Sequence, residues 1–388
     1  MPGNPIENPI FYVTRSRERA SGLPQNDSYK IISGDGSKDT LELLSDEKIQ
    51  KEIKKNNASV LVFKNTIQIE RLAKEKEFKL LNPSAELAEE IENKVTQAKW
   101  LGELSDFLPP HHITLVKKIT KDIFPSKDKD DHFILQWAHS HTGEGTIHIK
   151  KRADLEKIQK DFPERETRIS EYIKGPVFTS NIVVSPDKIL IGNISYQITG
   201  LKPFTDNIFS TIGNDWGLPH SILSESQLEK FNKIATAVAE KMQKSGWKGL
   251  FGIDVIHAEE KDEMHLIEIN ARQPASTTYE SELQQISRSH GVPGMTTFEA
   301  HVAALTNKPL TSLIGINDGA QIIQRVTREV KKLDTSELKN EGYRITEYNN
   351  SKANADLVRI QNTRGIMESH NKFNKRGKVI KEIIEKQV

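Results

Sequence analysis

The stretch from Gly252 to Arg272 constrains the fold of this chain most, because it has the pattern of a two-faced β-hairpin. Two β-rich runs, Ile253 to Ile256 and Met264 to Ile269, flank a polar turn centred near Lys261. Strand side chains alternate between two faces, so the register decides which residues lie together. We predict these opposite pairs: Gly252 and Asn270, Asp254 and Glu268, and Ile256 and Leu266 on one face, with Ile253 and Ile269, and Val255 and Ile267, on the other.

This register buries one apolar face and gathers Asp254, Glu268 and Asn270 on the other. Carboxylate and amide oxygens placed this close together suit a hard cation, and all-oxygen ligation is typical of Mg²⁺ (or Mn²⁺) that is also held by phosphates. Arg272 follows at once and adds a planar cation that can bind phosphate through two hydrogen bonds. The alternative interpretation is a solvated hairpin face that happens to be acidic.

The segments Gly249 to Asp254 and Leu266 to Arg272 resemble the signature of the ATP-grasp superfamily, the fold of D-alanine:D-alanine ligase and biotin carboxylase. In that family an acidic residue of the first strand and the Glu and Asn of the second hold the Mg²⁺ ions that bridge the ATP phosphates. The resemblance implies that Asp254, Glu268 and Asn270 hold the metal, and that Arg272 stabilises phosphate or an acyl-phosphate.

Three further segments resemble the nucleotide-binding parts of the family, so that the resemblance covers roughly residues 60 to 300. Residues 169–179 resemble the hinge strand, and residues 92–110 resemble the helix that carries a phosphate-contacting lysine. Residues 133–148 resemble a strand and the glycine-rich loop that folds over the phosphates with its backbone amides. The implied nucleotide contacts are Lys94, Gln136, Gly143, Gly145, Thr146, Glu171, Tyr172 and Ile173.

Two positions depart from the family pattern. The strand before the glycine loop usually ends in a lysine, and the hinge usually carries a second Glu for the ribose hydroxyls; here these positions are Gln136 and Val177. Gln136 can donate hydrogen bonds but supplies no charge, so phosphate affinity has to come from Lys94, Arg272, Mg²⁺ and the loop amides.

Two other groups of residues invite functional interpretations. The long segment 197–220 is rich in Gly, Asn and Pro and is interpreted as a lid or as a connection packed by its own aromatic residues, with Lys202 a candidate phosphate or substrate contact. His139, His141 and His148 flank the glycine loop, but their spacing does not match a zinc site, and a polar loop role is favoured.

Composition narrows the class of protein. The net charge is +1, from 55 Lys and Arg against 54 Asp and Glu, which gives no reason to expect a nucleic-acid or membrane partner. Cysteine is absent, which excludes disulfides, thiolate metal sites and a cysteine nucleophile. No signal-peptide pattern opens the chain, and no apolar run approaches the ~20 residues that span a bilayer. We expect a cytoplasmic enzyme that acts on small molecules, with a homodimer left open.

Strands that alternate with helical segments predict an α/β (α+β) chain, with an ATP-grasp fold and an N-terminal Rossmann-like domain. We predict four parts: an N-terminal α/β domain (1–110), a small subdomain with the glycine loop and hinge (111–180), a large subdomain with the Mg²⁺ and phosphate site (181–320), and a β-rich cap with a helix (321–388).

The predicted function is that of an ATP-grasp carbon–nitrogen ligase. ATP with Mg²⁺ would phosphorylate a substrate carboxylate, and an amine or similar nucleophile would displace phosphate, with release of ADP. Two alternatives stay open at this point. One is a carboxylase-type or nucleotide-biosynthesis enzyme of the same superfamily, and the other is a non-catalytic ATP-binding regulatory protein.

Overall fold

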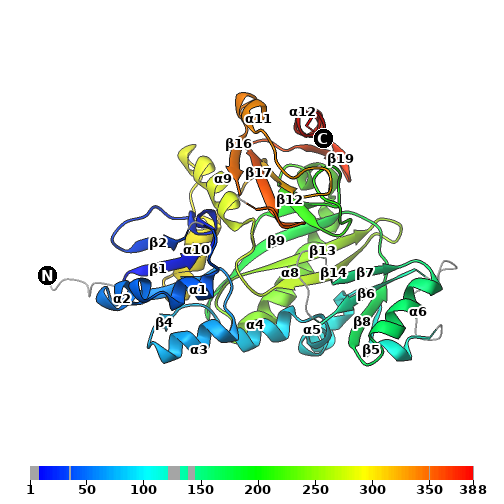
Figure 1. Ribbon diagram of the computed structural model, residues 1–388, viewed down its shortest axis with the longest axis horizontal. Coiled ribbons are helices and arrows are strands. Elements are labelled where there is room, and N and C mark those ends of the chain that lie inside the picture. Colours follow the sequence, from blue (N-terminus) through cyan, green and yellow to red (C-terminus); the bar gives the residue numbers. More distant parts are fainter. Residues whose placement is uncertain (1–7, 35, 121–131, 139–144, 349, 388) are drawn as a thin grey trace.

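A computed structural model describes residues 8–34, 36–120, 132–138, 145–348 and 350–387 of the chain. Within these residues the chain is a mixed α/β protein, as predicted, and three larger β-sheets lie around a common centre (Figure 1). None of the helices in the described ranges is both long enough and apolar enough to cross a lipid bilayer.

The N-terminal sheet is parallel throughout. Its strand order is β2-β1-β3-β4, as expected for a Rossmann-like unit in which helices connect neighbouring strands. Thr66 caps the helix after β3, because its side chain accepts a hydrogen bond from the backbone of Ile69. The elements of this part are β1 (Ile10–Thr14), η1 (Arg17–Ala20), β2 (Tyr29–Ser33), α1 (Thr40–Ser45), α2 (Glu47–Lys55), β3 (Ser59–Val62), α3 (Ile67–Glu75), β4 (Lys79–Leu80) and α4 (Ala85–Glu92).

The second sheet is antiparallel, with strand order β5-β8-β6-β7. The helical segment predicted within residues 92–110 is interrupted: α4 ends at Glu92, and α5 begins at Lys94 because the Asn93 side chain caps its first turn. The elements are α5 (Lys94–Leu101), η2 (Gly102–Phe107), β5 (His111–Leu115), η3 (Val116–Lys118), β6 (Phe133–Trp137), β7 (Thr146–Ile149), α6 (Arg152–Asp161) and β8 (Glu166–Glu171).

The third sheet has nine strands in the described residues, and it reaches from the predicted hairpin to the C-terminal region. Its order is β14-β13-β9-β11-β12-β15-β17-β16, with β10 beside β9. Its strands are β9 (Val177–Val184), β10 (Ile189–Leu190), β11 (Ile194–Thr199), β12 (Thr211–Asp215), β13 (Gly249–Ala258), β14 (Glu263–Asn270), β15 (Ala320–Arg325), β16 (Arg344–Glu347) and β17 (Asp356–Asn362).

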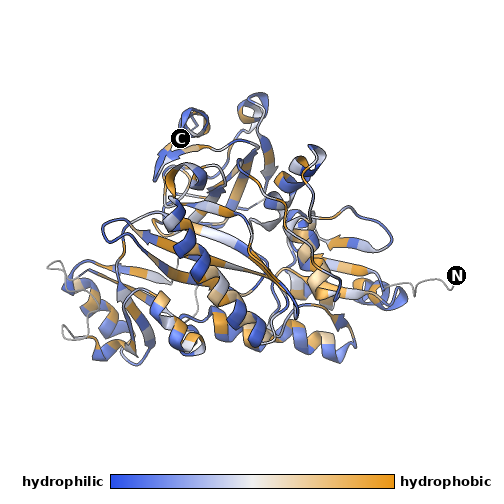
Figure 2. Cartoon of the chain, turned by 180° about the vertical axis from the view of Figure 1, so that it is seen from behind, coloured by the Kyte–Doolittle hydropathy of each residue, from blue (hydrophilic) through white to orange (hydrophobic). Residues whose placement is uncertain are grey.

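Helix α8 (Glu225–Lys244) covers one face of this sheet, and α10 (Thr297–Leu305) packs against part of the other face, near Val183 and Leu250. From behind, a long helix lies across the large sheet (Figure 2), and its apolar residues Phe231, Ile234 and Val238 are buried against Phe251, Ile253 and Val255 of β13 and their neighbours. The remaining elements are α7 (Pro219–Ile222), α8 (Glu225–Lys244), α9 (Thr277–Ser289), α10 (Thr297–Leu305), α11 (Ser336–Asn340), β18 (Met367–Ser369), β19 (Lys372–Phe373) and α12 (Lys375–Glu385).

Two predictions about connections need correction or comment. Segment 197–220 is not one long loop, because residues 197–199 belong to β11 and residues 211–215 to β12, and these strands pair with one another. Residues 321–388 do not stand apart from the preceding region, since β15 and β17 belong to the same sheet as the hairpin. The four-part division of the chain therefore stays a proposal, and the sheet connects its last two parts.

Candidate active site

The hairpin of β13 and β14 forms with most of the predicted register. Gly252 lies opposite Asn270, Ile253 opposite Ile269, and Asp254 opposite Glu268, as predicted. The register then shifts by one residue, so that Val255 pairs with Leu266 and Ile256 with His265, and the two predicted pairs beyond Asp254 are wrong. The physical reason is a β-bulge at Ile267, which lets Leu266 join Val255 in the core.

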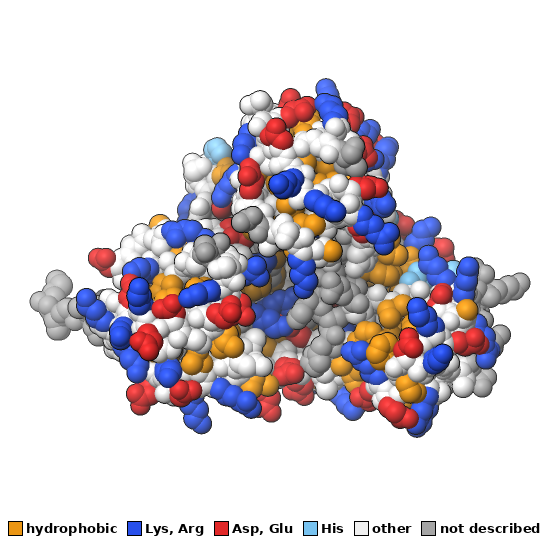
Figure 3. Space-filling view, viewed as in Figure 1, with side chains coloured by type: hydrophobic (Ala, Val, Ile, Leu, Met, Phe, Trp, Pro, Cys, Tyr) orange, Lys and Arg blue, Asp and Glu red, His pale blue; other side chains and the backbone are white. Residues whose placement is uncertain are grey.

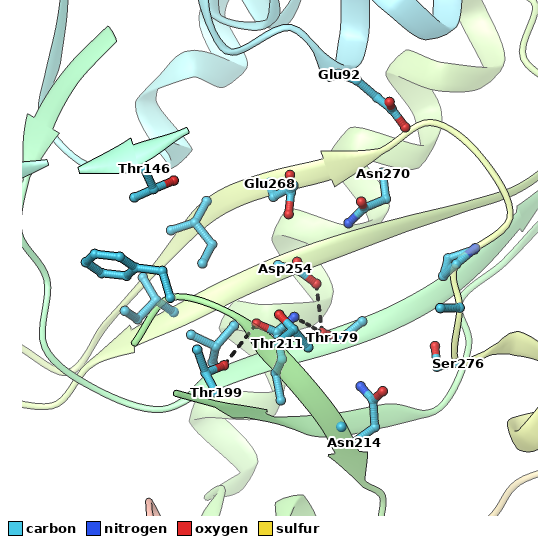
Figure 4. Close-up of a pocket in the computed structure, with 18 of the residues that line it drawn as sticks. Glu92, Thr146, Thr179, Thr199, Thr211, Asn214, Asp254, Glu268, Asn270 and Ser276 are labelled. Atoms are coloured by element: carbon cyan, nitrogen blue, oxygen red, sulfur yellow. Dashed lines mark hydrogen bonds between the residues drawn. The ribbon is translucent and has the colours of Figure 1, made fainter. Parts of the chain in front are cut away.

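Asp254 and Glu268 face one another across the hairpin, with Asn270 beside them (Figure 4). Burial and the neighbouring Glu268 carboxylate raise the pKa of Asp254 from 3.8 to about 7. Burial would also raise the pKa of Glu268, but the Lys94 ammonium group outweighs it and lowers the pKa of Glu268 to about 2. At neutral pH the pair therefore holds at least one negative charge, on Glu268.

A chain of hydrogen bonds orients Asp254 from the neighbouring strands. The Thr179 hydroxyl on β9 donates to Asp254 Oδ1 at 2.7 Å, and Gln197 Nε2 on β11 donates to Thr179 Oγ1 at 3.2 Å. Thr199 Oγ1 in turn donates to Gln197 Oε1 at 3.4 Å (Figure 4). Asp254 is thus held in one orientation while Glu268, whose side chain is 39% exposed, faces the open space.

Both cations that the sequence assigned to phosphate lie beside this pair. Lys94 Nζ lies 2.8 Å from Glu268 Oε1, and the lysine side chain is only 6% exposed. Arg272 forms an ion pair with Glu92 and donates from Nη2 to Asn270 Oδ1 at 2.7 Å. Lys94 and Arg272 therefore each contact a carboxylate, and Arg272 also contacts the predicted metal ligand Asn270. The sequence did not reveal these contacts.

These groups line a cavity of about 520 Å³, within the range of small-molecule sites. Figure 3 shows a hollow at the centre of this face, in which Lys and Arg side chains (blue) are visible. The predicted site residues that line the cavity are Lys94, Gln136, Thr146, Glu171, Tyr172, Ile173, Asp254, Glu268, Asn270 and Arg272.

Three predicted nucleotide contacts are not among the lining residues. Gly145 lies at the start of β7, where its carbonyl accepts a hydrogen bond from the backbone of Trp137 at 3.1 Å. Gly143, with His139 and His141, falls outside the residues that the structure describes. Lys202 is exposed and is not among the residues that line the cavity. Its proposed contact with phosphate or substrate stays a prediction.

The hinge lies at the other end of the cavity from Arg272, between β8 and β9. Glu171 forms an ion pair with Lys261 of the hairpin turn at 3.1 Å, and the Tyr172 ring stacks on His148 with ring centres 4.0 Å apart. Gly175 has φ +157°, and a Cβ atom there would lie 1.8 Å from the His257 carbonyl oxygen, so glycine is required for this close approach. Apolar side chains that include Ile134, Ile173, Val177, Ile256 and Phe209 line the same region.

The residues present fit a divalent cation bound together with phosphates. Two carboxylates and one amide supply oxygen donors only. A different kind of site, built from three or more His, Cys, Asp or Glu side chains, does not occur among the described residues. A Mg²⁺ ion needs further oxygen ligands beyond these three, which phosphates and water can supply.

The structure also places residues in the cavity that sequence reasoning missed. Thr179 and Arg168 each stand beside another polar residue, Ser180 on β9 and Thr167 on β8, so neither carried a distinct signal in the sequence. Arg19, Arg359 and Asp356 come from η1 and β17, and only the tertiary fold brings them to the same cavity.

Comparison with known proteins agrees with this geometry. A family model described as an ATP-grasp domain matches residues 91–276. The fold is similar to N5-carboxyaminoimidazole synthetase from Staphylococcus aureus in complex with ADP, with a TM-score of 0.69, 12% identity and 97% of each chain covered. Carboxyaminoimidazole ribonucleotide synthase from Aspergillus clavatus with ATP gives a TM-score of 0.67 at 13% identity, covering 98% of this chain and 99% of that one.

A second kind of ligase has the same fold. The L-amino acid ligase from Bacillus licheniformis superposes with a TM-score of 0.67 at 12% identity, over 98% of both chains. No curated protein matches the chain by sequence. Identities this low establish the fold and leave the substrate open.

Proposed function

The chain belongs to the ATP-grasp superfamily, and we propose that it is an ATP-dependent ligase that activates a substrate carboxylate as an acyl-phosphate and joins it to an amine. ADP and phosphate would be released. The observation that carries this proposal is the meeting of Asp254, Glu268, Asn270, Lys94 and Arg272 at the centre of one cavity. A protein that only bound nucleotide would have little use for two metal carboxylates and two cations around the same point.

Each group has a chemical task in this proposal. Asp254, Glu268 and Asn270 would hold Mg²⁺ (or Mn²⁺), which supplies charge neutralisation for the transferred phosphoryl group. Lys94 and Arg272 would stabilise the charge on the same phosphoryl oxygens, with Arg272 nearest the acceptor side. Glu171, Tyr172 and Ile173 would bind the adenine at the hinge. We propose no side-chain nucleophile, since the chemistry requires only positioning and charge.

The end of the cavity formed by Arg19, Arg325 and Arg359 suits an acidic substrate. The Arg19 backbone carbonyl accepts a hydrogen bond from Gln273 Nε2 at 2.7 Å, which ties this arginine to the residue after Arg272. Its guanidinium lies 4.2 Å above the Phe63 ring, and burial together with Arg359 lowers the pKa of Arg19. Asp356 and Glu18 are the carboxylates that act on these three arginines. The arginines outnumber them, and we propose that the acid carries a second anionic group.

The test uses a panel of carboxylic acids with Mg·ATP and hydroxylamine in place of the amine. Hydroxamate formed together with ADP supports the acyl-phosphate route, because hydroxylamine traps an activated acyl group. Hydroxamate with AMP would overturn the mechanism. Arg19→Gln should raise the KM for the responsive acid, whereas the control Arg17→Gln, on the exposed side of the same short helix, should not.

A second candidate is ATP-dependent carboxylation of an amine with bicarbonate as the acid. The similarity to carboxyaminoimidazole ribonucleotide synthases over almost the whole chain favours its inclusion. Bicarbonate therefore belongs in the acid panel, with ADP release dependent on an added amine as the positive result. No response to any acid, with nucleotide binding intact, would favour a regulatory protein.

A further inference from the structure

Arg168 on β8 is a buried cation in the wall of the cavity. The residue is 3% exposed, and burial lowers the pKa of Arg168 to about 10. Its donors reach neutral oxygens: Gln136 Oε1 at 3.1 and 2.8 Å, Gln97 Oε1 at 3.1 Å and the Ile267 carbonyl at 3.3 Å. No carboxylate of the described residues forms an ion pair with it.

A buried guanidinium without a carboxylate partner is costly, since its hydration is lost and no opposite charge replaces it. The Glu268 carboxylate favours the charged form of Arg168 but forms no ion pair with it. Such a cation is explained if an anion enters the cavity beside it. In the proposed function that anion is the phosphate chain of ATP.

Gln136 lies directly in front of this cation, because β6 and β8 pair with Gln136 opposite Arg168. Two N–H groups of Arg168 donate to Gln136 Oε1, and only the oxygen of the amide can accept them, so the amide nitrogen must point away from Arg168. Its other contact is a long hydrogen bond of 3.4 Å to the Thr146 hydroxyl. The Gln136 amide therefore has donor capacity that faces the cavity, with a positive charge behind it.

We propose that Gln136 and Arg168 together bind a phosphate group of the nucleotide. Gln136 donates the hydrogen bond, and Arg168 is a positioning residue that fixes the amide and supplies the positive charge. A single lysine at position 136 would supply both the hydrogen-bond donor and the positive charge. Here Gln136 on β6 supplies the donor and Arg168 on β8 supplies the charge. The proposal rests on the proposed function only in requiring that ATP or ADP binds in this cavity.

The alternative is that Arg168 only holds β8, α5 and the hairpin together through Gln136, Gln97 and Ile267. Gln136→Glu separates the two explanations. The glutamate keeps the shape and still accepts both hydrogen bonds from Arg168, so a purely structural link is preserved or strengthened. It removes the N–H donor and neutralises the cation, so the phosphate site is lost.

The experiment is isothermal titration of the full chain with ADP and with adenosine, which lacks phosphates. Gln136→Glu should weaken ADP binding by roughly tenfold to a hundredfold, the usual effect of losing a hydrogen bond to a charged group, and leave adenosine binding unchanged. Arg168→Gln should weaken ADP binding similarly, and the double variant Gln136→Lys with Arg168→Gln should restore it. Arg152→Gln, an exposed cation of the same subdomain, is the control.

The outcomes are distinguishable. If ADP does not bind the unaltered protein, the proposed function fails together with this inference. If ADP binds and Gln136→Glu binds it equally well, or if ADP and adenosine affinities fall in parallel, the phosphate role of the pair is wrong. Failure of the double variant to restore binding would also contradict it.

Discussion

Replacing Asp254 with asparagine should make the protein more stable and at the same time abolish its metal dependence. Burial and Glu268 raise the pKa of Asp254 from 3.8 to about 7, so the folded protein favours the protonated carboxyl. For such a group, stability is fully present below the unfolded pKa and is lost as the pH rises through the folded pKa. Asparagine resembles the protonated form at every pH and never incurs this loss.

The magnitude follows from the pKa difference. Each pH unit corresponds to about 1.4 kcal/mol, so ionising Asp254 in the folded protein costs up to about 4 kcal/mol above pH 7. Relaxation around the pair reduces this, and we expect Asp254→Asn to gain about 2 to 4 kcal/mol at pH 8 and almost nothing near pH 4. The Thr179 hydroxyl can still donate to the amide oxygen of asparagine, so the hydrogen bond is retained.

The assay is urea unfolding between pH 4 and pH 8 without nucleotide or Mg²⁺, paired with ADP titrations at several Mg²⁺ concentrations. Asp187→Asn, which removes an exposed carboxylate from the turn after β9, is the control and should show neither effect. A gain that does not grow with pH would refute the electrostatic argument. ADP affinity that still rises with Mg²⁺ in Asp254→Asn would refute the metal assignment.

Three further predictions test other parts of the site. Glu268→Gln should lower ADP formation by roughly 10³-fold or more at saturating Mg²⁺, since it removes the exposed metal carboxylate; near-normal turnover in the folded variant would contradict the assignment. Val177→Glu, at the cavity end of β9, should tighten ATP binding or leave it unchanged in a titration. A large loss of affinity would mean that residues 169–179 do not correspond to the hinge strand of the family. Asp215→Ala should destabilise the protein by about 3 kcal/mol or more in urea, because Asp215 accepts hydrogen bonds from the backbone of Gly217, Leu218, Ile366 and Met367, which would lose their partner; unfolding free energies equal to those of the unaltered protein would show that water replaces it.

The parts of the site that could be predicted are those written in local patterns. Alternation of polar and apolar residues was enough to place Asp254 opposite Glu268, and Thr66, a residue type that commonly caps helices, marks where α3 begins. The bulge at Ile267 could not be predicted, because no glycine or proline marks it. It results from the packing of Leu266 into a core that distant strands complete.

The ion pairs of the site were the larger feature that the sequence did not predict. Lys94 and Glu268 are 174 residues apart, and Arg272 and Glu92 are 180 residues apart, so neither ion pair leaves a trace in sequence spacing. Arg168 reads as an ordinary polar residue of a strand until the fold shows that it is buried behind Gln136.

The ion pairs also bear on how the site discriminates among ligands. A pair of opposite unit charges about 4 Å apart is worth about 4 kcal/mol at an effective dielectric constant of about 20. A divalent cation placed at Glu268 would repel Lys94 by a comparable or larger amount, so metal alone has to displace a favourable partner. Phosphate oxygens that arrive with the metal offer Lys94 and Arg272 a new partner each, while Glu268 passes to the metal. This exchange conserves the number of favourable charge contacts only when metal and nucleotide bind together. From the ion pairs of Lys94, Glu268 and Arg272 we therefore expect Mg·ATP to bind more tightly than either component alone.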